Sequence, residues 1–220
     1  MDKIDLDQLE HALSQERFAR YVDWADGDRR RAIALYTLNS RLSECFYIPL
    51  QALEIALRNR LHTVISAAAG ECWYDDPPYQ RGSFQGEQLE AAKKDLRDRG
   101  RDLTPGRVVA ALTFGYWTAF FGTVYEDQWR KVLHQVGKRA DGKGLSRKHF
   151  ARPLATIREL RNRVAHHEPI IGWDLPKHHS SILQLTAWLS PAAADWCRAC
   201  SRFDEVYPAE GIRLVNPHEG

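Results

Sequence analysis

The stretch LYTLNSRLSECFYIPLQALEIALRNRL (residues 35–61) carries the strongest fold signal in the chain. Pro49 falls inside it, where the missing amide hydrogen predicts a kink or a split of a helix. The sequence AAAG at 67–70 then supplies a glycine of the kind that ends helices. Apolar residues recur through this region at spacings of three and four, the period of one buried helix face: Leu35, Leu38, Leu42, Phe46, Leu50, Leu53, Leu57, Leu61 and Val64.

The chain on either side of this stretch is also helical in pattern, with no hairpin or β–α–β alternation. We therefore predict an all-α fold in one domain, residues 1–220, built as a helical bundle with additional helices. The further predicted elements are a loop over 74–86, a charged surface helix from Gln85 to Arg99, a basic glycine-punctuated loop over 137–144, a helix from Ser146, a helix ending at Leu189, and a helix from Ser190–Pro191 to about Phe203.

One segment, VVAALTFGYWTAFFGTVY (108–125), has no charge over eighteen residues, the lower limit for a membrane span. Thr104 and Pro105 precede it as an N-cap and a first helical residue. A helix that is apolar all round is more often buried in a protein core, and the rest of the chain is polar. We expect a buried helix here and no membrane partner.

Composition describes an ordinary globular protein. The 220 residues are 44% hydrophobic and 27% charged, with a net charge of +2, which argues against global disorder. The first residues, MDKIDLDQLEHAL, show no secretory signal. A cytoplasmic location with reduced cysteines is the expectation.

Basic residues concentrate between residues 130 and 163. Asp141 and Glu159 are the acidic residues of that range. Such a stripe suits a phosphate-bearing partner, but on charge alone a solvated surface is the better interpretation. The basic residues are Arg130, Lys131, Lys138, Arg139, Lys143, Arg147, Lys148, Arg152, Arg158, Arg161 and Arg163.

The end of this stripe, IRELRNRVAHHEPI (157–170), gathers arginine, asparagine and two histidines on one predicted helix. Arg158, Asn162 and His166 are four apart and share a face. Arg161 is five residues from His166, so it lies well off that face. The two side chains converge only if the helix loosens near its end or if the long arginine wraps across it.

Pro169 favours an end to the helix here, because proline pushes the preceding Glu168 out of helical geometry. The histidines then lie at a helix C-terminus, where the negative end of the dipole favours a protonated imidazole. An imidazole can move protons while a guanidinium holds a phosphate. RNA brings its own 2′-hydroxyl nucleophile, so this pair could cleave it without metal. The structural alternative makes Arg161 an ion-pair partner and His166 a helix cap.

The segment RNRVAH (161–166) fits the R-N-x-x-x-H signature of HEPN ribonucleases. With the blocks at 35–61, 106–121 and 157–170, taken in that order, the chain resembles the Abi-like (abortive-infection-like) family from about Tyr21 to Ile171. The resemblance implies an all-α HEPN-like helical bundle. It also implies a role in phage defence or as a toxin, with RNA as the substrate.

The resemblance further implies a homodimer, because HEPN ribonucleases usually place the motifs of two domains across a shared cleft. Arg161 would position the scissile phosphate, His166 would be the acid or base, and Asn162 would orient the pair. An antitoxin or a phage-derived trigger could restrain the protein. Residues that could support the site are His167, Glu168, Arg158, Glu54, Arg58 and Asn59.

Two other interpretations stay open: a non-catalytic HEPN module that binds RNA or protein, and a helical scaffold with a structural Arg–His cluster. We expect no cofactor and no metal. Adjacent histidines on a helix point about 100° apart and rarely chelate one ion. Cys197 and Cys200 lie in a helical pattern rather than in a redox motif's setting. Trp173, just after the motif, is a candidate for RNA contact.

Overall fold

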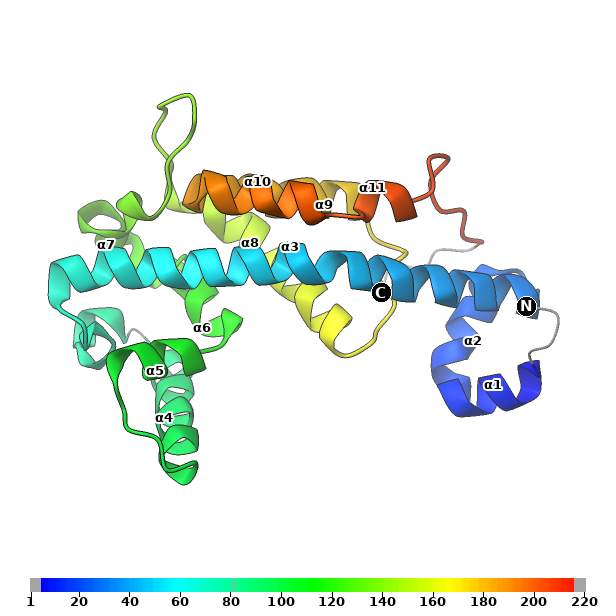
Figure 1. Ribbon diagram of the computed structural model, residues 1–220, viewed down its shortest axis with the longest axis horizontal. Coiled ribbons are helices and arrows are strands. Elements are labelled where there is room, and N and C mark those ends of the chain that lie inside the picture. Colours follow the sequence, from blue (N-terminus) through cyan, green and yellow to red (C-terminus); the bar gives the residue numbers. More distant parts are fainter. Residues whose placement is uncertain (1–4, 81, 216–220) are drawn as a thin grey trace.

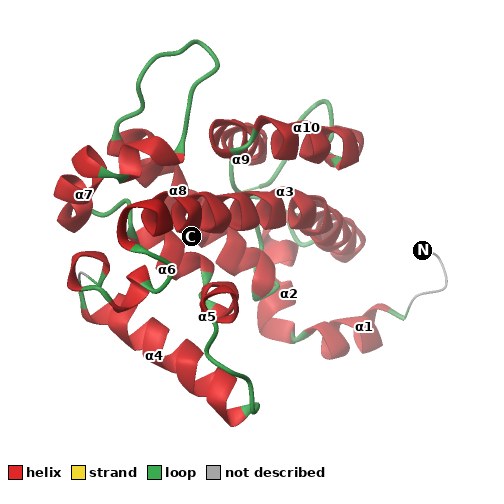
Figure 2. Cartoon of the chain, turned by 60° about the vertical axis from the view of Figure 1, so that its left-hand side comes forward, coloured by secondary structure: helices red, strands yellow, loops and turns green. Residues whose placement is uncertain are grey.

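The computed structural model describes residues 5–80 and 82–215, and helices are the only regular secondary structure in those ranges (Figures 1 and 2). The all-α prediction is confirmed. The α-helices are α1 Leu6–Leu13, α2 Gln15–Trp24, α3 Arg29–Ala69, α4 Ser83–Asp98, α5 Pro105–Ala111, α6 Phe114–Ala119, α7 Glu126–Lys131, α8 Arg147–Ala165, α9 Leu175–Leu189, α10 Pro191–Cys200 and α11 Phe203–Val206. The 3₁₀ turns are η1 Trp73–Asp75, η2 Pro77–Tyr79, η3 Thr123–Tyr125 and η4 Leu133–Val136.

Helix α3 is the axis of the fold, and it runs the length of the molecule in Figure 1. Its 41 residues begin after Asp28, whose carboxylate accepts hydrogen bonds from two backbone amides of the first turn. They end at Gly70, which has a positive φ of 85°, in agreement with the predicted glycine stop. Helices α2, α8, α9, α10 and α11 pack against α3.

Pro49 lies inside α3, which continues past it, so of the predicted kink or split the split is wrong. Proline removes one backbone hydrogen bond and crowds the preceding turn. On either side of it, however, Phe46 and Leu53 are fully buried in the core, and Pro49 is buried with them. Burying such side chains is worth roughly 1.5–3 kcal/mol each, which offsets the lost hydrogen bond.

The uncharged segment 108–125 is mostly buried, as expected, but it is not one helix. It is divided among α5, α6 and η3. Thr113 interrupts it with extended backbone, and its hydroxyl accepts a hydrogen bond from the amide of Tyr116 at 3.3 Å to start α6. The short helices direct the side chains of Trp117 and Phe120 toward Trp73, and the three rings pack together in an aromatic core. The segment therefore forms short helices whose large rings pack on several sides, rather than one long helix.

Within the described ranges, no helix has both the length and the apolar character needed to cross a membrane.

Candidate functional site

Helix α8 carries the motif, and its buried face fixes which way the motif points. Phe150, Leu154, Ile157 and Leu160 are all buried, at spacings of four and three. Ser146 caps the helix start, in a capping box with His149. The core face therefore holds α8 in one rotation about its axis. The remaining faces are turned toward α3 or toward solvent.

The C-terminal turn of α8 forms a Schellman motif. The amide of Glu168 donates to the carbonyl of Arg163 at 2.8 Å, and the amide of His167 donates to the carbonyl of Val164 at 3.3 Å. His167 occupies the position usually taken by glycine, with a φ of 57° in the left-handed region. Histidine is among the residues enriched there, but the conformation is uncommon for any side chain. The helix thus ends at Ala165, and His166 is its C-cap.

The chain after this turn is held from two sides. The guanidinium of Arg163 lies 5.0 Å from the centre of the Trp173 ring, and its Nη1 is 3.7 Å from Glu168. The side-chain oxygen of Asn39 accepts hydrogen bonds from the amides of Ile170 (2.7 Å) and Ile171 (3.3 Å). Asn39 is 5% exposed, so these buried bonds fix the turn against α3. Trp173 is half-buried and covered by Arg163.

A groove of about 630 Å³ lies between α3 and the end of α8. Arg161 lines it, with its Nε 3.9 Å from Oε2 of Glu54 on α3. Burial raises the pKa of the Glu54 carboxyl, and the charges of Arg161 and Arg58 offset part of that rise. The lining residues are Tyr36, Asn39, Ser40, Ser43, Glu44, Tyr47, Leu50, Gln51, Glu54, Arg161, Val164, Ala165 and His167.

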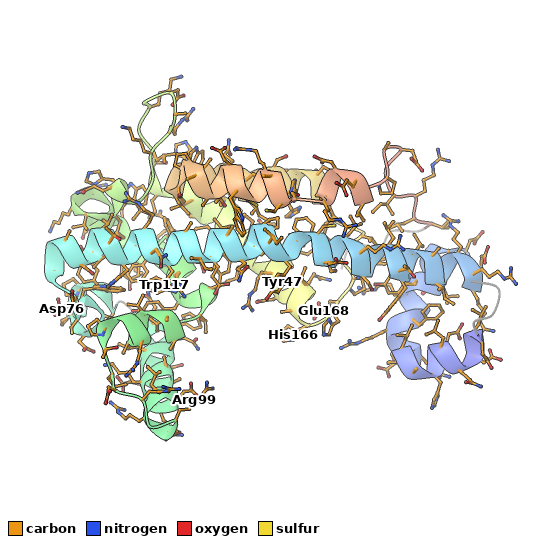
Figure 3. All side chains as sticks on the ribbon, in the orientation of Figure 1. Tyr47, Asp76, Arg99, Trp117, His166 and Glu168 are labelled. Carbon is orange, nitrogen blue, oxygen red and sulfur yellow. The ribbon has the colours of Figure 1, made fainter. Side chains whose placement is uncertain are left out.

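The structure therefore brings together three of the residues named from sequence, Arg161, Glu54 and His167. The left-handed backbone of His167 reverses the chain, and this returns its side chain to the side of Arg161. His166 and Asn162 are exposed and are not among the lining residues. Figure 3 labels His166 and Glu168 just beyond the end of α8, on the same side of α3 as Tyr47.

Arg161 and His166 do not converge within one chain. Helix α8 stays regular through Ala165, so the five-residue offset keeps the two side chains roughly 140° apart around the axis. Neither the loosened helix end nor the wrapped arginine considered from sequence is observed. Arg161 instead reaches Glu54.

The other predicted supporting residues do not line the groove that contains Arg161. Arg58 is half-buried on α3, and its Nε donates to the side-chain oxygen of Asn59 at 3.3 Å. Asn59 lines a second, apolar groove of about 410 Å³ between α3 and α10. Arg158 is exposed on α8. Glu168 belongs to the Schellman turn.

Asn39 is the residue of this site that sequence reasoning missed. It lies on α3 beside the apolar run, yet it is buried and binds the loop after the motif, more than a hundred residues away. An asparagine within an otherwise apolar helix face was the available signal, because a buried amide needs partners. The identity of those partners depends on the tertiary fold.

The basic stripe of residues 130–163 is divided by internal contacts. Arg147 is 7% exposed and donates to the Glu126 carboxylate at 2.7 Å, which holds the pKa of Glu126 below its usual range. Arg139 pairs with Asp141 at 2.7 Å. These arginines stabilise turns of the chain. Exposed positive charge remains on both sides of these contacts, at Lys131 and Lys138 before α8 and at Lys148, Arg152 and Arg158 on α8.

A family model described as Abi-like protein matches residues 11–172, most of the chain. The match runs from α1 through the loop that follows α8, so it contains α3, the motif and the groove. No curated protein and no solved structure matches the chain.

Proposed function

This chain belongs to the Abi-like protein family, and on that basis we propose that it is a metal-independent endoribonuclease. It acts as a homodimer, in phage defence by abortive infection or as a toxin. An antitoxin or a phage-derived trigger restrains it in the cell.

One observation carries the proposal: an arginine, a carboxyl group of raised pKa and a histidine line one groove at the end of α8. Arg161 offers a guanidinium fork that matches the geometry of a phosphate. Its carboxylate neighbour Glu54 is 3.9 Å away, at the outer limit of an ion pair, so a phosphate can compete for the guanidinium. The groove is open to a strand of RNA at the exposed end of the helix.

The reaction needs two proton transfers. A base takes the proton of the 2′-hydroxyl, and the 2′-oxygen attacks phosphorus. The bond from phosphorus to the 5′-oxygen breaks, and an acid gives that oxygen a proton. The products carry a 2′,3′-cyclic phosphate and a 5′-hydroxyl. General acid–base catalysis supplies on the order of 10²–10⁴ in rate, and stabilisation of the phosphate charge adds to it.

We assign one proton transfer to His166, which the R-N-x-x-x-H motif designates, with Asn162 orienting it. His166 is exposed and does not line the groove that Arg161 lines. That orientation suits a histidine that acts with the arginine of a second protomer across a shared cleft. His167 faces Arg161 of its own chain and is a candidate for the second transfer.

The test compares wild type with His166→Ala, His167→Ala and Arg161→Ala on total RNA and tRNA in the presence of EDTA. His11→Ala, an exposed histidine on α1, is the matched control. We expect wild type and His11→Ala to leave 2′,3′-cyclic phosphate and 5′-hydroxyl ends, and His166→Ala and Arg161→Ala to lose this activity. EDTA excludes a divalent metal from the reaction.

The same assay separates the alternatives. RNA bound equally by all variants but cut by none would replace the proposal with a non-catalytic RNA-binding module. Equal cleavage by wild type and His166→Ala would remove His166 from the site. If His167→Ala alone abolished cleavage, the proton transfer would belong to the histidine that lines the groove.

A further inference from the structure

A basic pocket of about 810 Å³ lies between the loop of residues 137–146 and the helices α9 and α10, and we name it the α9–α10 pocket. Figures 1 and 2 show this loop projecting from the body of the molecule beside those helices. The volume falls in the range of small-molecule sites, about 300–1,000 Å³. Its charged and aromatic lining residues are Arg60, Lys138, Arg139, Trp188, Asp195 and Arg198.

The α9–α10 pocket is separate from the Arg161 groove. Among the described residues, none lines both. The Abi-like match ends at residue 172, before α9 begins. The pocket therefore depends on helices that lie outside the matched region.

Two of the four basic side chains in this pocket are already paired with carboxylates. Arg139 lies 2.7 Å from Asp141, and Arg198 is paired at 2.7 Å with an aspartate of its own helix. In the described part of the chain, Arg60 and Lys138 have no carboxylate within ion-pair distance. The pocket thus carries uncompensated positive charge, which favours an anionic ligand.

The guanidinium of Arg60 is held in place before any ligand arrives. Its Nη2 donates to the carbonyl of Gln135 at 2.8 Å, and its Nε donates to the carbonyl of Val136 at 3.2 Å. No hydrogen-bond partner of its Nη1 lies within the described ranges. A positioned guanidinium with free donors suits a phosphate, because little conformational freedom is lost on binding.

Lys138 and Trp188 are joined by the backbone. The amide of Lys138 donates to the carbonyl of Trp188 at 2.8 Å, so a free ammonium and an indole lie at the same pocket. The indole is half-buried, and its N–H has no hydrogen-bond partner in the described chain. The rings of Phe150 and His149 meet it at 70° and 90°, so neither stacks parallel on it. An indole offers both a stacking surface and a donor to a ligand.

We propose that the α9–α10 pocket binds a free nucleotide. Its phosphates lie against Lys138 and the Nη1 group of Arg60, and its base lies against Trp188. Cations hold the phosphates by charge-assisted hydrogen bonds, and an aromatic side chain accepts any base by stacking. This ligand takes no part in the proposed reaction at Arg161. It joins α3, the 137–146 loop and α9, so binding should raise the melting temperature of the protein.

The test titrates the full chain, in EDTA and without RNA, with ATP, GTP, CTP and UTP by calorimetry. The matching nucleosides and inorganic triphosphate serve as the two halves of the ligand. We expect at least one nucleotide to bind more tightly than its nucleoside and than triphosphate. Lys138→Ala should weaken nucleotide binding by at least about tenfold, the effect of one hydrogen bond to a charged group, and leave nucleoside binding unchanged.

A second variant tests the base-binding side of the pocket. Trp188→Leu should weaken nucleotide and nucleoside by about tenfold and leave triphosphate unchanged, because a base stacked on an aromatic ring is worth about 1–3 kcal/mol. Lys177→Ala removes another exposed lysine on α9, outside the pocket, and should bind as wild type does. Circular dichroism checks the fold of each variant. Lys138 is exposed and its ammonium has no partner in the described chain, so Lys138→Ala tests the pocket even if Trp188→Leu is unstable.

Four results would overturn the assignment. They are a folded wild type that binds none of the four nucleotides, equal affinity for nucleotide and triphosphate, nucleotide binding that Lys138→Ala does not change, and displacement of the nucleotide by a single-stranded RNA that binds more tightly. The second would mean general attraction of anions, and the last would assign the pocket to an RNA strand. Because no cleavage is measured, each result is independent of the proposed ribonuclease activity.

Discussion

The same four residues, Leu-Arg-Asn-Arg, occur at 57–60 in the middle of α3 and at 160–163 near the end of α8. In both places the second arginine donates hydrogen bonds to backbone carbonyls of another segment, and these bonds stabilise the fold. Arg60 donates to the backbone carbonyls of Gln135 (2.8 Å) and Val136 (3.2 Å). Arg163 donates to the carbonyl of Pro169 and packs on an aromatic ring.

The two regions differ in the chain that comes after these four residues. After the first, α3 continues, and His62 accepts a hydrogen bond from the indole of Trp73 at 3.0 Å, half-buried. After the second, α8 ends, and His166 and His167 are exposed beside a groove that Arg161 lines. The helix end, rather than the four residues, therefore leaves histidines exposed where the proposed reaction needs them. A histidine inside a helix finds a structural partner, whereas one at its end remains open to a substrate.

The greatest change should be in catalysis at the second region. Arg161→Ala should reduce RNA cleavage by about 10²–10³, the usual loss when one group that stabilises developing charge is removed. Its unfolding free energy should change by less than about 1 kcal/mol, because its ion pair with Glu54 is partly exposed and long. Single-turnover cleavage and urea unfolding measure the two quantities. A large loss of stability with unchanged cleavage would make Arg161 a structural residue and remove the contrast between the two regions.

At the first region the expected effect is on stability. Arg60→Ala leaves two backbone carbonyls of η4 without their guanidinium donor, and Val136 is buried. The cost should be about 1–3 kcal/mol in unfolding free energy. Urea unfolding measures it, with Arg58→Ala, whose side chain donates to its neighbour Asn59, as the matched control. Equal unfolding free energies of the two variants would contradict the assigned role of Arg60.

Much of this architecture could be predicted because its causes are local. The three–four spacing gives α3, Gly70 ends it, and Ser146 starts α8, since caps and periodicity depend on neighbours in sequence. The prediction of one helix over 108–125 is wrong, because a segment without charged residues has too little contrast between its faces for a period to be read. Its division follows from ring packing that only the fold provides.

The candidate site, like the fold, could be predicted from the sequence only in part. That Arg161 and the histidines lie at a helix end could be predicted, because Pro169 limits the helix. The groove could not. It depends on the left-handed backbone of His167 and on Asn39 binding a loop far along the chain. These are tertiary effects, and they decide which histidine shares a surface with the arginine.

A smaller effect should appear in the pH dependence of stability at the first region. Burial lowers the pKa of His62, partly offset by Glu71. Below about pH 6.5 the unfolded chain takes up a proton that the folded chain does not, so stability falls as pH falls. His62→Gln, which can still accept from the indole, should lessen that fall. Urea unfolding at about pH 7.5 and about pH 5.5 measures it. Part of the fall should persist, because burial also lowers the pKa of His179.

The least change is expected at Glu54, which tests the second region directly. Because burial raises its folded pKa above the unfolded value, the folded chain keeps the proton to higher pH, and stability falls as pH rises through that window. Arg161 makes the larger of the two contributions from positive charges that oppose the rise in the Glu54 pKa. Arg161→Ala should therefore raise the pKa of Glu54 further, whereas Arg60→Ala should leave it unchanged.

Carbon-13 NMR of the glutamate carboxyls, assigned with Glu54→Gln, measures this pKa. Arg58→Ala should raise it less than Arg161→Ala, because Arg58 is the weaker of the two opposing charges. RNA bound in the groove should act as Arg161→Ala does, since a phosphate that takes the guanidinium leaves the carboxyl without its partner and adds negative charge beside it. A Glu54 pKa that responds to neither change would mean that arginine and carboxyl do not meet. The reactive character of the helix end would then rest on the histidines alone.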